Sequence, residues 1–328
     1  MAERTRSSSP HRGTILVADI GGTSIKLGAA RDGMPLDARQ RLQTKLLRCA
    51  KPVETLAGIL REFAHAHDLS FDATVLTLPG LIDTDFDHLL NITAIPELDG
   101  RPLASDLTMH LGSPVYLERD AVLLLEGERV AGAAESQDRV LGIFFGTGIG
   151  AAYVDAGLPF RGAGWALEIG HWPISHDGTT LEGLQPDRLE VHASGRTLET
   201  LANTHGCAVS DVFTTGATIP ELQEKLDAVV RHQAFAVATA IITMSPALTI
   251  LGGGVLEMRD YPLAQLKNLI QQRATLVSER PPRLVSAMLS WQATLYAAPA
   301  VVAQRTGGVS SYAQSDFNFE GFFHGRDE

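Results

Sequence analysis

Short apolar runs alternate with longer amphipathic stretches along most of the chain, which is the pattern of an α/β protein. The apolar runs predict strands at residues 15–18, 25–30, 73–78, 114–117, 139–145, 151–155 and 248–251. Apolar residues at helical spacing predict helices at residues 52–68, 121–130, 219–244 and 261–277. The polar residues 1–12 and the Gly- and Ser-rich residues 307–328 are expected to be tails.

The hydrophobic pattern contains a weak internal repeat. "GTSIKLGAARDGMP" begins at Gly22, and "GTGIGAAYVDAGLP" begins at Gly146. The two stretches match at a constant offset without a gap, so that Ile25 corresponds to Ile149 and Pro35 to Pro159. Both copies predict a strand, a glycine turn and a second strand. A duplicated domain accounts for this better than coincidence.

Composition narrows the class of protein. The 328 residues suit about two domains, and 45% hydrophobic with 20% charged residues is typical of a globular protein with a substantial core. The net charge of −11 argues against binding to nucleic acid, and no apolar run is long enough to cross a membrane. Residues 1–12 lack the apolar segment of a secretory signal. Cys49 and Cys207 are expected to be buried thiols in a reducing cytoplasm.

The two glycine turns are the first candidates for chemistry. They consist of Gly21, Gly22 and Thr23, and of Gly146, Thr147 and Gly148. A phosphate loop needs free backbone N–H groups with a hydroxyl beside them, although each turn alone is equally a plain hairpin turn. In the Walker A and Rossmann motifs the glycines open a helix, whereas here each turn opens a strand. This favours the actin-like ATPase and sugar-kinase architecture, in which two phosphate loops face each other across a cleft.

Seven motifs together resemble the ROK family (repressor, open reading frame, kinase) of bacterial sugar kinases, from about Thr14 to Arg305. They are "DIGGTSIK", "LPGLID", "ERDA", "FFGTGIGAAYVDAGLPFRGAG", "EIGHWPI", "LEVHASGRTLE" and "ILGGGV". The resemblance implies a ribonuclease H-like α/β fold with one lobe of residues 13–118 and 290–306 and another of residues 119–289. It also implies phosphorylation of a hexose by ATP with Mg²⁺, and a homodimer. Arg119, where the family has Asn, and "GGGVLEMRDYP" resemble the allose-kinase-like branch.

Two acidic residues follow predicted strands. Asp120, after the strand at 114–117, is the candidate general base for the sugar hydroxyl; by its position alone it equally caps the following helix. The resemblance favours catalysis, because the catalytic Asp of the family falls on Asp120. Asp19 ends the first strand and is expected to hold Mg²⁺ through water, or else to hydrogen-bond the turn. Strand alternation places Lys26 on a solvated surface rather than at phosphate.

Further site residues come from the resemblance. Gly252, Gly253 and Gly254 would let a backbone approach the adenosine, although a triple glycine after a strand is also an ordinary flexible turn. The family's sugar-contacting positions fall on Glu168, His171 and Glu190, with Gly80 supporting the sugar site and Arg119 beside the base. Without the resemblance, the two Glu fit solvated residues and the His fits a core position.

Three departures from the family pattern bear on metal and substrate. The zinc-binding cysteines of many members are replaced by Leu181, Gly183 and Arg188, so no zinc is expected. His171 is then expected to be free to orient the sugar, and Arg188 to help hold the loop at 177–189. Ala94 and Arg119 stand where two family Asn contact sugar, which predicts a substrate other than plain glucose. Arg119 could instead be turned outward or pair with phosphate.

The sequence therefore predicts ATP-dependent phosphorylation of a hexose or hexose derivative at the 6-hydroxyl, with Asp120 as general base. The expected partner is a small-molecule sugar, and neither nucleic acid nor a membrane is expected to bind. The alternative is a catalytically weak or inactive sugar-binding regulator of the same family.

Overall fold

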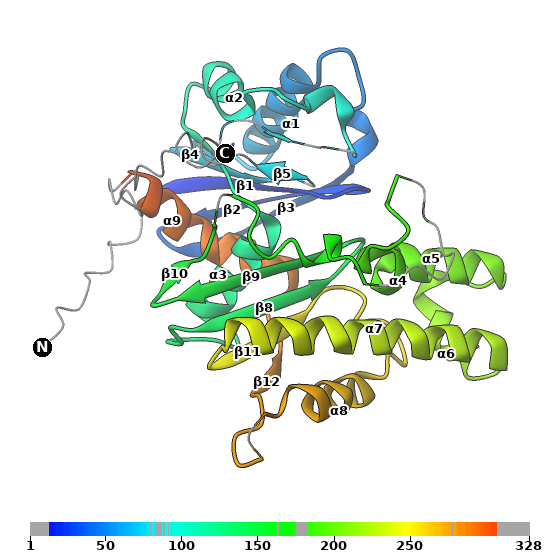
Figure 1. Cartoon of the computed structure of the whole chain (residues 1–328). Helices are drawn as coiled ribbons and strands as arrows, with labels where there is room; N and C mark the ends of the chain where they lie inside the picture. The colour runs from blue at the N-terminus through cyan, green and yellow to red at the C-terminus, as the bar shows by residue number, and fades with distance from the viewer. Residues whose placement is uncertain are drawn as a thin grey trace, which may run out of the picture.

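Two sheets form the centre of the molecule. The computed structural model describes residues 13–306 apart from residues 79, 83–86, 88, 91, 93, 163, 175–180, 182 and 277. Within these ranges there are two five-stranded sheets, with orders β3-β2-β1-β4-β7 and β10-β9-β8-β11-β12 (Figure 1). The first sheet contains β1 (Thr14–Ile20), β2 (Ser24–Arg31), β3 (Met34–Gln43), β4 (Ala73–Thr77) and β7 (Val115–Leu117). The second contains β8 (Val140–Phe145), β9 (Ile149–Asp155), β10 (Leu158–Pro159), β11 (Leu248–Gly252) and β12 (Leu284–Ser286).

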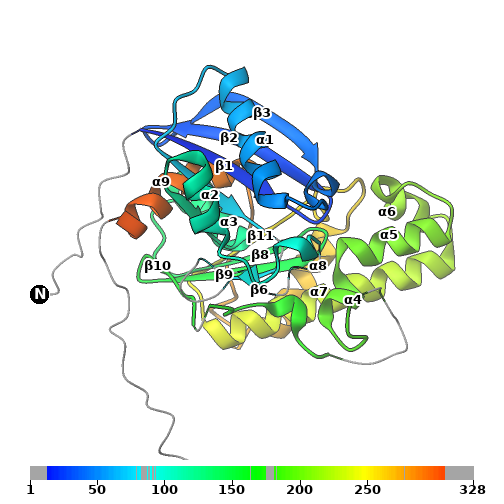
Figure 2. The same cartoon turned by 90° about the horizontal axis from the view of Figure 1, so that it is seen from above.

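Helices and short elements complete the chain. The helices are α1 (Pro52–Ala66), α2 (Leu103–Leu111), α3 (Asp120–Ala131), α4 (Leu189–Ala193), α5 (Gly195–Thr204), α6 (Val212–Gly216), α7 (Pro220–Met244), α8 (Leu263–Ala274) and α9 (Ala293–Thr306). The 3-10 turns are η1 (Thr44–Leu47), η2 (Pro96–Leu98), η3 (Ile169–His171), η4 (Val209–Asp211) and η5 (Ser290–Gln292). A short ribbon pairs β5 (Leu81–Ile82) with β6 (Leu89–Leu90). Helices α5 and α6 lie together at one end, beside the start of the long helix α7 (Figure 2).

The two sheets have the same topology. In the first, β1 is antiparallel to β2 and parallel to β4, and β4 is parallel to β7. In the second, β8 is antiparallel to β9 and parallel to β11, and β11 is parallel to β12. The strands carrying the sequence repeat thus occupy equivalent places, which agrees with a duplicated domain.

Strand alternation divides the core into layers. Along β1, Leu16 and Ala18 pack into the core under α1 and α2, whereas Ile15 and Val17 pack into the core with α9. Asp19 follows Val17 by two residues and therefore points to the α9 side of the first sheet. Helices α3 and α9 contact each other, and α9 runs between the first and second sheets (Figure 1).

The expected helices and strands are present with small shifts at their ends, but several elements were not expected, among them α4, α5, α6, β5, β6, β10 and β12. The polar edge strand β3 has Ala38 as its single buried residue, and α2 and α9 also lay outside the predicted segments. Cys49 and Cys207, expected to be buried, are free and half-buried. Among the described residues, no helix is both long and apolar enough to span a bilayer. Residues 1–12 and 307–328, interpreted as tails, lie outside the described residues.

Candidate functional site

The two glycine turns lie next to each other in space. A Cβ built on Gly22 would lie 3.9 Å from Thr147 Cγ2, with no other heavy atom of the described surroundings within 4 Å. The β1–β2 turn and the β8–β9 turn, which are far apart in sequence, therefore face one another. Thr23 and Thr147 are both exposed at this point, so their hydroxyls are accessible to a ligand.

The β8–β9 turn is held from behind by the N-terminus of α5. The amide of Gly195 donates to Gly146 O at 2.9 Å, and the amide of Arg196 donates to Thr147 O at 3.2 Å. In a trans peptide the carbonyl and the following N–H point in opposite directions. Because both carbonyls face α5, the N–H groups of Thr147 and Gly148 point away from it.

The β1–β2 turn is held in the same manner by one residue. Thr44, 1% exposed at the start of η1, donates its hydroxyl to Gly21 O at 2.7 Å and its amide to Thr23 O at 3.1 Å. The N–H of Gly22 consequently points away from Thr44. Within the described ranges, the amides of Gly22, Thr147 and Gly148 donate to no protein acceptor. Free N–H groups in facing turns form an arrangement suited to an anion.

Asp19 is fixed beside the first turn by two donors. Thr77 Oγ1 donates to its Oδ1 at 2.8 Å, and Lys26 Nζ lies 3.0 Å from its Oδ2. The expectation of a solvated Lys26 is therefore wrong. Asp19 and Lys26 are direct partners in the antiparallel β1–β2 pair, so their side chains share one face of the sheet.

Asp120 is the first residue of α3 and follows β7 closely. Its Oδ1 accepts from the amide of Ala121 at 2.6 Å and would lie 3.6 Å from a Cβ built on Gly150, just after the second turn. The residue keeps solvent access, yet the protein around its carboxyl group desolvates it and raises its pKa to about 6. The negative charges of Asp19 and Glu168 raise this pKa further, while the Ala121 amide and Arg119 lower it.

Arg119 is turned inward, not outward, and it pairs with Glu168. It is 5% exposed, and its Nη2 lies 2.8 Å from Glu168 Oε1. Its Nη1 donates to Ala166 O at 2.6 Å, and its Nη2 donates to Ala151 O at 3.1 Å. Burial raises the pKa of Glu168, against the opposing effect of Arg119.

His171 is not free, because Arg188 Nη1 contacts its Nδ1. A guanidinium can only donate, so Nδ1 must be the acceptor and the proton of the neutral ring must be on Nε2. Partial burial and the charge of Arg188 both lower the pKa of His171, which favours the neutral ring. The ring is therefore prepared to donate one hydrogen bond from Nε2.

Glu190, in α4, lies against the second turn. Its carboxylate oxygens would be 2.9 Å from a Cβ built on either Gly148 or Gly170, so both positions need glycine for this close approach. Burial raises the pKa of Glu190, and Arg196 opposes this. The charges of Glu168 and Asp120 also raise the pKa of Glu190, and the charge of Glu168 raises that of Asp120.

Two of the three glycines at the end of β11 are closely packed, unlike those of an ordinary flexible turn. A Cβ on Gly252 would lie 2.8 Å from Ala287 Cβ, and one on Gly253, whose φ is +95°, would collide with the backbone of Phe145. Of the three, only Gly254 would carry a Cβ with no described heavy atom within 4 Å. Gly80 directly precedes β5 and is exposed; Pro79 and Asp83 of the same motif lie outside the described residues.

The positions of the family's zinc ligands carry no thiol. Leu181 and Gly183 have no ligating side-chain atom, and Arg188 is engaged with His171. No group of three or more His, Cys, Asp or Glu that could hold a metal occurs within the described part of the chain. Of the loop at 177–189, residues 177–180 and 182 lie outside that part.

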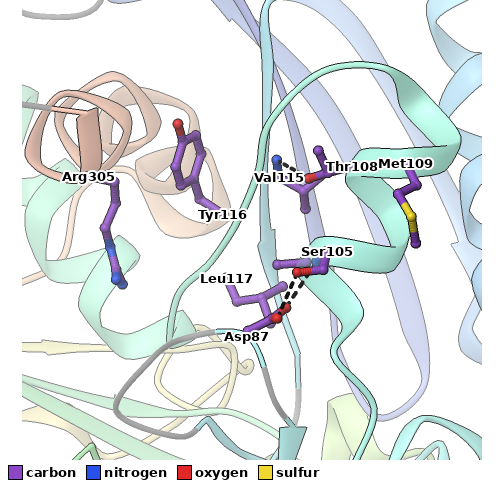
Figure 3. A pocket seen from close by; sticks show the side chains of 9 residues that line it. Asp87, Ser105, Thr108, Met109, Val115, Tyr116, Leu117 and Arg305 are labelled. Atoms are coloured by element: carbon purple, nitrogen blue, oxygen red, sulfur yellow. Dashed lines mark hydrogen bonds between the residues drawn. The ribbon is translucent and has the colours of Figure 1, made fainter.

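A cavity of about 580 Å³ lies elsewhere, beside the edge strand β7 (Figure 3). It is lined by β7, α2 and Arg305, and Ser105 donates to Asp87 at its rim from its amide at 3.0 Å and its hydroxyl at 2.8 Å. None of the predicted site residues lines it.

Sequence reasoning missed four residues that support the site: Thr44, Thr77, Gly195 and Arg196. Thr77 was the easiest to find, because β4 is a buried strand next to β1 and Thr77 pairs with Asp19. Gly195 and Arg196 lie within the motif "LEVHASGRTLE", but nothing in that motif assigns them to the second turn. Thr44 approaches the first turn from a distant part of the sequence, and no local pattern marks it.

The model of the ROK family matches residues 15–305. An N-acetyl-D-glucosamine kinase of Vibrio cholerae is 35% identical over 163 residues, which span 48% of this chain and about half (52%) of the length of that relative. An N-acetyl-D-glucosamine kinase of Vibrio parahaemolyticus is 28% identical over 255 residues, covering 72% of this chain and 83% of the relative.

Solved structures show the same fold. A ROK family glucokinase from Streptomyces griseus, in complex with glucose and AMPPNP, has a TM-score of 0.76 at 23% identity and covers 89% of this chain and 100% of its own. A ROK family transcriptional regulator, a homologue of the E. coli MLC protein, has a TM-score of 0.75 at 19% identity, with 89% and 78% covered. The expected α/β fold of actin-like ATPases and sugar kinases is confirmed.

Proposed function

Because the chain belongs to the ROK family, we propose that it is a sugar kinase that transfers the terminal phosphate of ATP to a hexose or hexose derivative. The observation that carries this proposal is the approach of the two glycine turns, with 3.9 Å between a Cβ on Gly22 and Thr147 Cγ2. A triphosphate needs donors to several oxygens at once, and the free N–H groups of both turns supply them. Residues 13–118 with 290–306 would form the lobe carrying the first turn, and residues 119–289 the lobe carrying the second.

Asp19 suits a role in holding Mg²⁺. Mg²⁺ keeps several of its waters, so a carboxylate fixed near the phosphates can bind those waters without direct coordination. Thr77 and Lys26 hold both oxygens of Asp19 and so define its orientation. Mg²⁺ bound with ATP would neutralise charge on the phosphates. The open space around Gly254 leaves room for the nucleoside.

Asp120 is the proposed general base for the 6-hydroxyl of the sugar. Its pKa of about 6 leaves it mostly ionised at neutral pH and more basic than an ordinary Asp. It lies close to Gly150, and therefore close to the turn that would bind the terminal phosphate. Glu168 and Glu190 would accept hydrogen bonds from other sugar hydroxyls, and His171 would donate one from Nε2.

The identity of the sugar is a separate part of the proposal. The two relatives named above are N-acetyl-D-glucosamine kinases, so the allose-kinase-like branch rests on the sequence around Arg119 and after Gly252 alone. A regulator without catalysis is the second candidate, because a ROK family transcriptional regulator shares the fold at nearly the same TM-score as the glucokinase. The fold therefore does not separate the two functions.

A coupled assay for ADP release separates them. We expect Mg²⁺- and sugar-dependent ADP release with at least one of N-acetylglucosamine, N-acetylmannosamine, allose, glucose, mannose and fructose. The product is identified by NMR, with the phosphate expected on the 6-oxygen. Calorimetric binding of a sugar without ADP release from any of them would support the regulator instead.

A further inference from the structure

Arg119 is buried and contacts two other segments of the site, β9 and the loop before η3. Its guanidinium donates to Ala151 O in β9 at 3.1 Å, to Ala166 O at 2.6 Å, and lies 2.8 Å from Glu168 Oε1. It directly precedes Asp120 at the start of α3. Its side chain thus links the start of α3, where the proposed base lies, to the loop that carries Glu168, the proposed sugar ligand.

The ion pair with Arg119 engages only one of the two carboxylate oxygens of Glu168. Oε1 is engaged with Arg119, which leaves Oε2 for a ligand. The side chain of Glu168 is 24% exposed, whereas that of Arg119 is 6% exposed. A sugar would therefore meet one oxygen of Glu168 and not the guanidinium, so Arg119 acts through Glu168 and not by direct contact.

On this basis, and resting on the proposed kinase function, we propose that Arg119 is a positioning residue of the sugar site. It keeps Glu168 ionised with a single oxygen presented to the substrate, and it offsets the negative charge that surrounds Asp120. A substrate recognised in this way places one hydroxyl donor, and not a pair of donors, at Glu168.

The charges facing Asp120 support the second half of this proposal. Asp19 from β1, Glu168 from the loop before η3 and Glu190 from α4 are acidic, and Lys26 is engaged with Asp19. Arg119 lowers the pKa of Asp120, and it also lowers that of Glu168 against the effect of burial. Removing its charge should therefore raise both pKa values.

Two substitutions separate charge from geometry. Arg119→Gln removes both the positive charge and the geometry of the guanidinium. We therefore expect the acid limb of the pH profile of the rate to move to higher pH. The KM for sugar should rise about tenfold, as for a lost hydrogen bond to a charged group. Arg119→Lys keeps the charge but cannot reach three acceptors at once. It should raise the KM for sugar while leaving the acid limb near its original pH.

The matched control is Arg139→Gln, which breaks an exposed pair with Asp155 at 3.2 Å and should change neither quantity. A folded Arg119→Gln variant with an unmoved acid limb and unchanged KM would overturn this inference and leave the kinase function intact. If Arg119→Gln does not fold, an Arg119→Lys variant with unchanged KM for sugar overturns it. Absence of ADP release by the unmodified protein with every sugar would overturn the kinase function itself, and with it this inference.

Discussion

The β1–β2 and β8–β9 turns occupy equivalent places in two sheets of the same topology, yet they are held differently. Thr44 alone fixes two carbonyls of the first turn, and the space around Gly22 is open apart from Thr147. The second turn is packed against the start of α5, with a Cβ on Gly195 only 2.5 Å from Gly146 O. The second turn is thus firmly embedded, whereas the first depends on a single residue, through its hydroxyl and its amide.

The acids beside the two turns differ as well. Asp19 accepts from Thr77 and Lys26, so its charge is directly matched by a cation. Asp120 lies in acidic surroundings with one local amide donor, and its pKa is raised to about 6. A duplicated framework has therefore placed two carboxylates in different environments, and only the one at Asp120 is more basic than an ordinary Asp, as its proposed role as a base requires.

The largest expected effect comes from removing the second acid. Asp120→Asn keeps the shape of the side chain but cannot accept a proton, so kcat should fall about 10²- to 10⁴-fold. The KM values for ATP and sugar should change far less, because the turns and the sugar ligands remain. Steady-state kinetics with the best sugar of the panel measures this. Asp155→Asn, an exposed carboxylate paired with Arg139, is the control, and equal kcat in the two variants would refute the assignment of the base.

A methyl group tests how rigidly each turn is embedded. Gly195→Ala would force the backbone of the second turn to shift, which should cost about 1–3 kcal/mol of unfolding free energy. Gly22→Ala meets no atom closer than 3.9 Å, so it should cost less than about 0.5 kcal/mol and instead raise the KM for ATP.

Urea unfolding and ATP kinetics together check this contrast. Gly58→Ala in α1, where a Cβ would meet nothing within 4 Å, is the control for glycine replacement in a helix. If Gly22→Ala were the more destabilising of the two turn variants, the proposed difference in packing would be wrong.

The pH dependence of the rate tests the two acids together. Below its pKa of about 6, Asp120 becomes protonated and can no longer accept the hydroxyl proton, so kcat/KM should fall about tenfold per pH unit. Asp19→Asn removes a negative charge that raises this pKa, and should move the acid limb to lower pH. Rate profiles between pH 4 and pH 8 provide the measurement. If Asp19→Asn left the acid limb at its original pH, the charge of Asp19 would not influence the pKa of Asp120.

The sequence predicted the parts of the site that are local. The glycine turns, Asp19 and Asp120 each stand at the end of a strand marked by its own apolar run. The position of Lys26 was wrong because alternation along one strand says nothing about its neighbour across the sheet. The hairpin register pairs Ile20 with Ile25, and hence Asp19 with Lys26.

The contacts that hold the site together were not predictable in this way. Arg188 reaches His171, and Arg119 reaches Glu168, only because segments that are separated in the sequence converge. The edge strand β3 was missed because nine of its ten residues are not buried and its apolar alternation is weak. Helix α9 is buried along much of its surface between the sheets, so it lacks a clear polar face.

The smallest expected effect concerns the side chain that supports the first turn. Thr44→Val keeps the shape of a 1%-exposed residue but removes the 2.7 Å hydrogen bond to Gly21 O, while its amide bond to Thr23 O remains. The lost bond is worth about 1 kcal/mol, which corresponds to roughly a fivefold rise in the KM for ATP if it serves to aim the Gly22 amide. Thr294→Val is the matched control, since Thr294 is equally buried and donates to Trp291 O at 2.8 Å in η5 and α9. Both variants should lose similar stability, but only Thr44→Val should weaken ATP binding. The same KM for ATP in both would mean that Thr44 supports the fold and not the orientation of the turn.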